Sequence, residues 1–229
     1  ISILSQTRPE WVMCDMGIIC IGCVTAPIYH SNTNEQVFYI ANQSDSVFAF
    51  VEDQEQLDKM LAIWDSLPNI KKIIVLDRYH PPNLPNVYPL DQFLELGREY
   101  GKEHPDQFEE LIDTCHPDEV ISFTYTSGTT GDPKAAIFTS RNIIASSKHL
   151  PDATGLNSED LYVSYLPLAH IAERLIGHFL RFLVGNPTVF AESMEDMPQN
   201  IRQTGPTVVF GTPRVWEKFY SRILTGIDD

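Results

Sequence analysis

Basic side chains are scarce in this sequence of 229 residues. It contains 16 lysines and arginines against 31 aspartates and glutamates, which leaves a formal net charge of -15 at pH 7. A protein that binds nucleic acid needs clustered lysine and arginine to neutralise phosphates, so this imbalance argues against a nucleic-acid partner. Any bound nucleotide must be held by donors placed locally, with the help of Mg²⁺, because the overall field of the chain repels anions.

Cysteine is also scarce, and the 4 residues present are too few for a disulfide scaffold at this length. Cys20 and Cys23 form a C-x-x-C pattern, for which zinc binding and redox chemistry are the functional alternatives. The run around them, Met16–Val24, is apolar, and no second pair of ligands has suitable spacing. We therefore expect both thiols to pack as small hydrophobic side chains in a reducing, cytoplasmic compartment.

Long apolar runs are missing as well. The best membrane-span candidate, Trp11–Ile28, is interrupted by Asp15 and broken near its end by Pro27. It falls short of the roughly 20 apolar residues that a spanning helix needs, so we expect a buried helix followed by a short strand. The first residues also lack the basic charge and the cleavage pattern of a signal peptide.

What the chain does contain is an alternation of strand and helix patterns in its first portion, residues 1–77. Strands are predicted at Val24–Ile28, Val47–Val51 and Lys71–Leu76, with helices at 9–22, 34–42 and Glu55–Leu67. Thr33 followed by Gln36 predicts a capping box at the start of the second helix. Strands alternating with helices indicate a parallel α/β sheet.

Two further portions follow. Residues 78–119 contain a proline-rich connecting loop, His80–Pro89, and two helical patterns. Residues 120–229 carry the remaining predicted strands, which are Val120–Tyr125, Ala135–Thr139, Leu161–Leu166, Thr188–Phe190 and Thr207–Phe210. Leu175–Val184 is apolar enough to predict a buried helix, and further helices are predicted from Ser140, Ser193 and Thr212.

A loop of hydroxyl side chains and glycines comes directly after the predicted strand Val120–Tyr125. It consists of Thr126, Ser127, Gly128, Thr129, Thr130, Gly131, Asp132, Pro133 and Lys134. Glycine lets backbone N–H groups turn toward one point, the hydroxyls add donors and Lys134 adds a positive charge, a combination that suits a polyphosphate. The spacing is not that of a Walker A motif. A plain hairpin turn is the alternative, but a turn needs neither so many donors nor a lysine at its end.

A second stretch with chemical potential runs from Tyr165 to Arg174. Pro167 ends a predicted strand, and His170 falls at the strand-to-helix turn, where α/β sheets gather ligands. The alternative is a helix-start ion pair between His170, Glu173 and Arg174. The pattern is not H-E-x-x-H, so it does not imply zinc.

Both stretches resemble motifs of the acyl-adenylate-forming enzymes. The loop matches the T-S-G-T-T-G-x-P-K-G pattern except that Ala135 replaces the last glycine. Y-L-P-L-A-H-x-x-E, beginning at Tyr165, resembles the fourth core motif of long-chain fatty acyl-CoA synthetases, and Gly211–Lys218 resembles their G-x-P-R-V-W-E-K segment. The opening segments Arg8–Trp11 and Val24–Tyr29 fit as well. The sequence is most similar to the bubblegum-type and related bacterial branch.

The resemblance implies the fold and the chemistry of an AMP-forming acid–thiol ligase. The fold it implies is part of a large α/β N-terminal domain, a mostly parallel sheet flanked by helices. It implies that Thr126–Gly131 cradle the β- and γ-phosphates of ATP, that Lys134 neutralises them and that His170 lies beside the acyl carboxylate. The apolar helix after His170 would help wall an acyl tunnel, and Arg214 is either structural or pocket-lining. Fatty acid, Mg·ATP and coenzyme A are the implied substrates.

Motifs that this family carries further along do not occur before Asp229, including the small C-terminal domain with its catalytic lysine. We therefore expect residues 1–229 to be an incomplete AMP-binding domain that cannot complete adenylation alone. Two alternatives remain: another adenylate-forming ligase, acting on aryl or amino acids, and a non-catalytic nucleotide- or lipid-binding remnant. Peripheral membrane contact is compatible with a lipid substrate, although no segment demonstrates it, and no feature predicts an oligomeric state.

Overall fold

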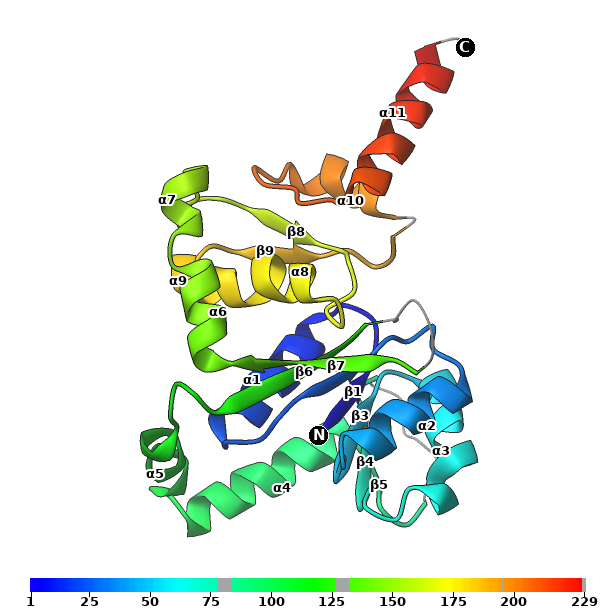
Figure 1. The fold of residues 1–229 in the computed structure, drawn as a ribbon, viewed down its shortest axis with the longest axis vertical. Helices are drawn as coiled ribbons and strands as arrows, with labels where there is room; N and C mark the ends of the chain where they lie inside the picture. The colour runs from blue at the N-terminus through cyan, green and yellow to red at the C-terminus, as the bar shows by residue number, and fades with distance from the viewer. Residues whose placement is uncertain (78–83, 127–131, 195, 228–229) are drawn as a thin grey trace.

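A parallel sheet organises the first part of the chain in the computed structural model, which describes residues 1–77, 84–126, 132–194 and 196–227. Within these residues a 5-stranded sheet has the order β2-β1-β3-β4-β5, and every neighbouring pair is parallel. The strands are β1 (Ser2–Leu4), β2 (Ala26–Ile28), β3 (Phe48–Val51), β4 (Lys72–Val75) and β5 (Val87–Pro89). The predicted fold class, a mostly parallel α/β sheet flanked by helices, is confirmed (Figure 1).

Helices cover both faces of this sheet because strand side chains alternate between the faces. Ile73 and Val75 point into a core shared with α2 (Asn34–Gln43) and α3 (Gln54–Ile63). Ile74 and Leu76 point into a second core, which they share with Trp11 and Ile18 of helix α1. The elements that complete this part are α1 (Pro9–Cys20), the 3₁₀ turn η1 (Trp64–Ser66), α4 (Leu90–Glu103) and α5 (Gln107–Thr114).

The predicted capping box at the start of α2 is confirmed. The side-chain oxygen of Thr33 accepts the N–H of Gln36 at 3.4 Å, and Oε1 of Gln36 accepts the N–H of Thr33 at 3.1 Å. Two backbone donors that a helix start leaves unpaired are thereby satisfied. This interaction is local in the chain, which is why the sequence alone revealed it.

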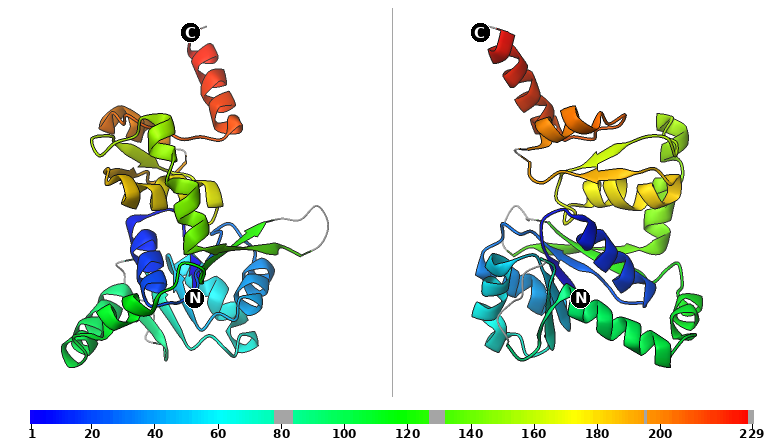
Figure 2. Two further views of the ribbon diagram at one scale, coloured as in Figure 1. Left: turned by 60° about the vertical axis from the view of Figure 1, so that its left-hand side comes forward. Right: turned by 180° about the vertical axis from the view of Figure 1, so that it is seen from behind.

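The second part begins with an antiparallel hairpin and continues with a smaller parallel pair. β6 (Val120–Thr126) pairs with β7 (Lys134–Thr139), and β8 (Tyr162–Ser164) pairs with β9 (Thr188–Phe190). A parallel bridge from Thr25 to Ser122 joins the hairpin to the edge of the first sheet. Figure 2 shows the hairpin extending sideways out of the body of the molecule. The helices here are α6 (Ser140–Ser147), α7 (Leu150–Thr154), α10 (Met197–Thr204) and α11 (Pro213–Ile227).

The segment after His170 differs from the single apolar helix that its composition predicts. It consists of α8 (Ile171–Glu173), a π-helical turn η2 (Arg174–Phe179) and α9 (Leu180–Val184). Arg174 and His178 on the π-helical turn are buried, whereas Phe182 and Leu183 are exposed. Arg174 and His178 can be buried because Asp15 of α1 contacts both side chains, and the hydropathy of the segment does not contain this contact.

Several other predictions were wrong in detail. The strand β1 was not predicted, and β5 lies within the segment His80–Pro89 that was predicted to be a loop. β5 tolerates Pro89 because it is an edge strand of the sheet. The predicted strand Thr207–Phe210 is reduced to a bridge between Tyr162 and Val208, and the helix predicted from Ser193 begins at Met197.

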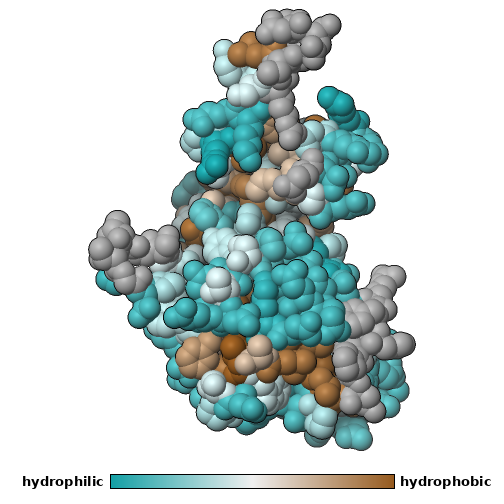
Figure 3. All heavy atoms as spheres, turned by 90° about the vertical axis from the view of Figure 1, so that its right-hand side faces the viewer, coloured by the Kyte–Doolittle hydropathy of each residue, from teal (hydrophilic) through white to brown (hydrophobic). Residues whose placement is uncertain are grey.

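The surface on the side of α2 and α3 is largely hydrophilic, with a band of apolar side chains in its lower half (Figure 3). At the opposite end of the molecule α11 extends away from the body (Figure 1). Within the described part of the chain, no helix has the length and hydropathy to cross a membrane. The run Trp11–Ile28 forms helix α1 followed by strand β2, as its sequence predicts.

Candidate active site

A cavity of about 300 Å³ lies where the hairpin, the start of α2 and the start of α8 meet. Thr126 and Pro133, which flank the predicted phosphate loop, line it together with His170. The remaining lining residues are Tyr29, Asn32, Gln36, Ile40, Thr124, Tyr125 and Ile171. Two motifs that are far apart in the sequence therefore share one cavity, and its walls carry hydroxyl, amide and imidazole groups that can bind an anion.

The predicted phosphate loop is only partly placed. Ser127, Gly128, Thr129, Thr130 and Gly131 lie outside the described residues. Thr126 at the end of β6 stands opposite Lys134 at the start of β7 in the antiparallel register. Lys134 is exposed and is not among the residues that line the cavity, so the structure brings Thr126 to His170 but does not bring Lys134 there.

His170 is held by its neighbours in a defined orientation. Its ring nitrogen Nδ1 accepts the backbone N–H of Ala172 at 3.2 Å, so His170 is the N-cap of α8. With Nδ1 acting as an acceptor, the proton of the neutral ring lies on Nε2. The described residues offer no hydrogen-bond partner to Nε2, which leaves an N–H donor on an exposed ring at the cavity. A carboxylate or phosphate oxygen is the natural acceptor for such a group.

The loop that carries His170 is anchored to the end of β1. The hydroxyl of Thr7 donates to the carbonyl of Leu166 at 2.6 Å and accepts the N–H of Leu168 at 3.0 Å. One hydroxyl thus satisfies both sides of the turn before His170. The residue pattern of the sequence did not single out Thr7, because its partners lie 159 and 161 residues away.

Glu173 and Arg174 do not form the helix-start ion pair with His170 that was the alternative interpretation. Arg174 pairs with Asp15 of α1, and both side chains are almost completely buried. Oδ2 of Asp15 also contacts Nε2 of His178 at 2.9 Å. Burial alone raises the pKa of the Asp15 carboxyl, but Arg174 and His178 outweigh it and hold that pKa below its usual value.

Glu173 belongs to a separate buried group beneath β8. Its carboxylate accepts the hydroxyl of Ser164 at 2.6 Å and that of Tyr162 at 3.0 Å. Gly177 leaves the space for it, because a Cβ at this position would overlap Oε1 of Glu173. Burial raises the pKa of Glu173 from 4.5 to about 7, although both hydroxyl hydrogen bonds act to lower it.

This raised pKa predicts a loss of stability as the pH rises. Between the unfolded pKa of 4.5 and the folded pKa of about 7 the native state binds more protons than the unfolded state, so the free energy of unfolding falls with pH across this window. The variant Glu173→Gln lacks this pH-dependent contribution to the free energy of unfolding. We expect the stability of the variant relative to the parent to rise by up to about 3 kcal/mol from low to neutral pH, measured by urea denaturation. Parallel pH profiles would contradict the assignment, and Glu159→Gln controls for the loss of an exposed carboxylate.

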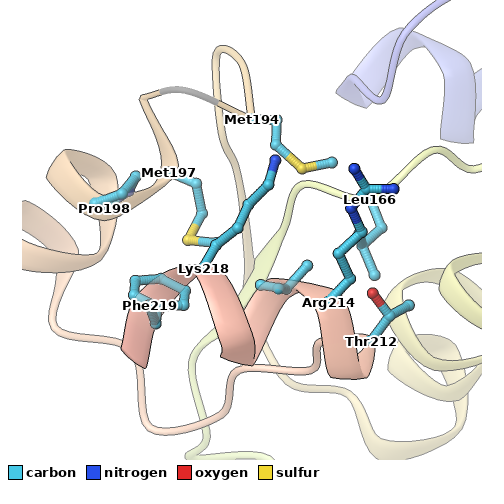
Figure 4. A pocket seen from close by; sticks show the side chains of 9 residues that line it. Leu166, Met194, Met197, Pro198, Thr212, Arg214, Lys218 and Phe219 are labelled. Carbon is cyan, nitrogen blue, oxygen red and sulfur yellow. The ribbon is translucent and has the colours of Figure 1, made fainter. Parts of the chain in front are cut away.

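Two further cavities are lined in part by residues that precede His170, Leu166 in one and Tyr165 and Pro167 in the other. One of about 260 Å³ has Arg214 and Lys218 of α11 on one side, with Leu166, Met194, Met197 and Phe219 among its apolar walls (Figure 4). Arg214 lines this cavity, and the choice between its two possible roles stays a prediction. The second, of about 330 Å³, has Gln6, Thr7 and His30 in its wall, at the carboxyl ends of β1 and β2. Open α/β sheets bind ligands outside the carboxyl ends of their strands, which is where this cavity lies.

The four cysteines are free thiols. Cys20 and Cys23 are half-buried at the end of α1, and Cys23 packs against the core shared with that helix. Within the described ranges no group of three or more His, Cys, Asp or Glu side chains could hold a metal ion.

The fold is that of an α/β protein, with a cavity between the β6–β7 hairpin and a histidine-capped helix. Residues 1–225 match the sequence profile of AMP-binding enzymes, and the chain belongs to this family. It is 33% identical over 230 residues to the long-chain-fatty-acid–CoA ligase ACSBG1 of Homo sapiens, covering 97% of this chain and 31% of that protein. It is 35% identical over 233 residues to ACSBG2 of Xenopus laevis, with 97% and 31% covered. The chain thus spans about a third of these relatives.

The fold is shared with solved structures of lower sequence identity. The long-chain-fatty-acid-CoA ligase FadD1 from Archaeoglobus fulgidus superposes with a TM-score of 0.74 at 19% identity, covering 98% of this chain and 42% of that chain. The resemblance to bubblegum-type ligases that the motifs indicated is therefore confirmed.

Proposed function

We propose that this chain forms the phosphate-loop side of the active site in an AMP-forming acid–thiol ligase that converts long-chain fatty acids into acyl-CoA. The observation that carries the proposal is the shared cavity, which Thr126 and Pro133 on the two flanks of the loop line together with His170. Because the formal net charge is -15, ATP must be bound by such local donors. The relatives named as long-chain-fatty-acid–CoA ligases support the substrate class.

In the first step the fatty carboxylate oxygen attacks the α-phosphorus of ATP, and the bond from that phosphorus to the bridging oxygen of the β-phosphate breaks. The products are an acyl-adenylate and pyrophosphate. In the second step the thiol of coenzyme A attacks the acyl carbon, loses its proton and displaces AMP. Attack at phosphorus depends on alignment of the reacting atoms and on stabilisation of the developing charge.

The described residues have distinct tasks in this proposal. The Nε2–H of His170 donates to the fatty carboxylate and orients it, while Nδ1 stays engaged with Ala172. Thr126 begins the loop that binds the β- and γ-phosphates, and Lys134 neutralises them from the other end of that loop. Mg²⁺ enters with the nucleotide, bound to its phosphate oxygens. Each methylene buried by the acyl chain contributes about 0.8 kcal/mol, which favours long chains.

The test is ATP–pyrophosphate exchange by the full-length protein that contains this chain, with a panel of one long-chain fatty acid, one aryl acid and one amino acid. We expect exchange with the fatty acid and little with the other two, followed by acyl-CoA formation when coenzyme A is added. Exchange supported chiefly by the aryl or amino acid would make the protein a different adenylate-forming ligase. No exchange with any acid would instead favour a non-catalytic binding protein.

A further inference from the structure

Arg174 connects two walls of the candidate active site without lining the cavity itself. It follows His170 by one helical turn, and its backbone N–H donates to the carbonyl of His170 at 3.1 Å. Its guanidinium, which is buried, donates to the hydroxyl of Ser122 on β6. One residue therefore contacts both the helix that begins at His170 and the strand that ends at Thr126.

Ser122 is held firmly at the base of that strand. It forms a parallel bridge with Thr25 beside β2, and its hydroxyl hydrogen is directed to the carbonyl of Phe123 at 2.9 Å or of Thr25 at 3.3 Å. The hydroxyl oxygen is thereby free to accept from Arg174. Because Ser122 is part of β6, a displacement of Ser122 would also displace the end of this strand. Thr124, Tyr125 and Thr126 at that end all line the cavity.

Asp15 fixes the direction of the guanidinium. Nη2 of Arg174 donates to Oδ1 of Asp15, and Nε donates to Oδ2 at 3.3 Å. The planar guanidinium is thus bound by two hydrogen bonds to one carboxylate. The side chains of Trp11 and Phe179 lie against its faces at 5.3 and 5.4 Å. The remaining nitrogen, Nη1, is the one that faces Ser122.

We propose that Arg174 is a positioning residue, which through Ser122 sets the distance between His170 and the phosphate-loop flank at Thr126. The inference rests on the proposed function, because this distance is what aligns the fatty carboxylate with the α-phosphate of ATP. A small misplacement of reacting groups lowers the turnover number while ATP contacts elsewhere preserve KM.

Ser122→Ala tests the link most directly, because it removes one hydroxyl and leaves the Asp15–Arg174 pair intact. In ATP–pyrophosphate exchange by the full-length protein, we expect kcat to fall by about tenfold or more while KM for ATP changes less than about twofold. Arg174→Lys keeps the charge opposite Asp15 but loses the guanidinium that donates to Asp15 and Ser122 together, so it should lower kcat similarly. The double variant should lose no more than either single variant, because both break the same contact.

Ser147→Ala is the matched control. Ser147 is a buried serine on α6 whose hydroxyl has no partner among the described residues, and its loss should leave kcat unchanged. Melting temperatures of all variants distinguish misplacement from unfolding. The proposal is overturned if Ser122→Ala keeps a kcat within twofold of Ser147→Ala, or if the two losses multiply in the double variant.

A second readout does not depend on activity. The Cε1–H resonance of His170, assigned by its disappearance in His170→Gln, should shift in Ser122→Ala and stay in place in Ser147→Ala. An unchanged resonance in Ser122→Ala contradicts the positioning role even if the protein catalyses no exchange. Absence of exchange in the unmodified protein contradicts the proposed function instead, so the two failures are distinguishable.

Discussion

Lys134→Ala is expected to lower the rate of fatty-acid-dependent ATP–pyrophosphate exchange by about 10²-fold. The proposed role of Lys134 is to neutralise the negative charge that grows on the leaving pyrophosphate. Removing one preorganised donor from such a site typically costs between about 10² and 10³ in kcat. The side chain is exposed at the start of β7, directly opposite Thr126 in the hairpin, so its removal leaves the packing of the core unchanged.

The measurement is pyrophosphate exchange at saturating fatty acid over a range of ATP concentrations, with Lys148→Ala as the matched control. Lys148, at the C-terminal end of α6, is also exposed, so the control makes the same change of charge away from the cavity. Both variants should melt at the temperature of the parent protein. If Lys134→Ala retained a rate within threefold of the control, the lysine would have no part in binding the phosphates.

Asp15→Ala is expected to destabilise the folded protein severely. Both Asp15 and Arg174 are buried, and the substitution leaves the guanidinium without its counter-charge in the interior. Breaking a buried ion pair by removing one partner costs about 3–5 kcal/mol. This is a large share of the roughly 5–15 kcal/mol that stabilises a typical domain. Urea denaturation with tryptophan fluorescence measures the loss.

Removing both charges should destabilise the folded protein less than Asp15→Ala alone. In Asp15→Leu/Arg174→Met no charge is left unpaired, so we expect part of the lost stability to return, although Ser122 and His178 each lose a partner. Asp118→Ala is the control, because the Asp118–Arg141 pair is exposed and its loss should be small. A double variant that is less stable than Asp15→Ala would contradict the assigned role of the unpaired charge.

The same pair predicts acid sensitivity. The pKa of Asp15 is lower in the folded protein than in the unfolded chain, so its contribution to stability is complete above the unfolded value and is lost as the pH falls through the folded value. Glu173 has the opposite sign, because burial raises its pKa to about 7. The two buried carboxylates therefore favour folding over different pH ranges.

Much of the fold followed from patterns that are short in sequence. The alternation of strands and helices, the Thr33–Gln36 capping box and the strands on both sides of the predicted phosphate loop were all predicted from neighbouring residues. The errors occurred where the position of a segment in the sheet determines its structure. In β5, for example, the proline is acceptable only because the strand lies at the edge of the sheet. Of the predicted site residues, the structure unites Thr126 with His170, and the roles of Lys134 and the loop remain predictions.

By itself the sequence determined the local elements, the family motifs and the chemical character of the loop, because each depends on residues close together in the chain. The tertiary structure alone decided that Arg174 meets Asp15 across 159 residues, that Thr7 anchors the turn before His170 and that η2 is π-helical. A buried charge is tolerated only when a distant partner reaches it with the right geometry. That geometry arises when the elements pack together, and no stretch of sequence contains it.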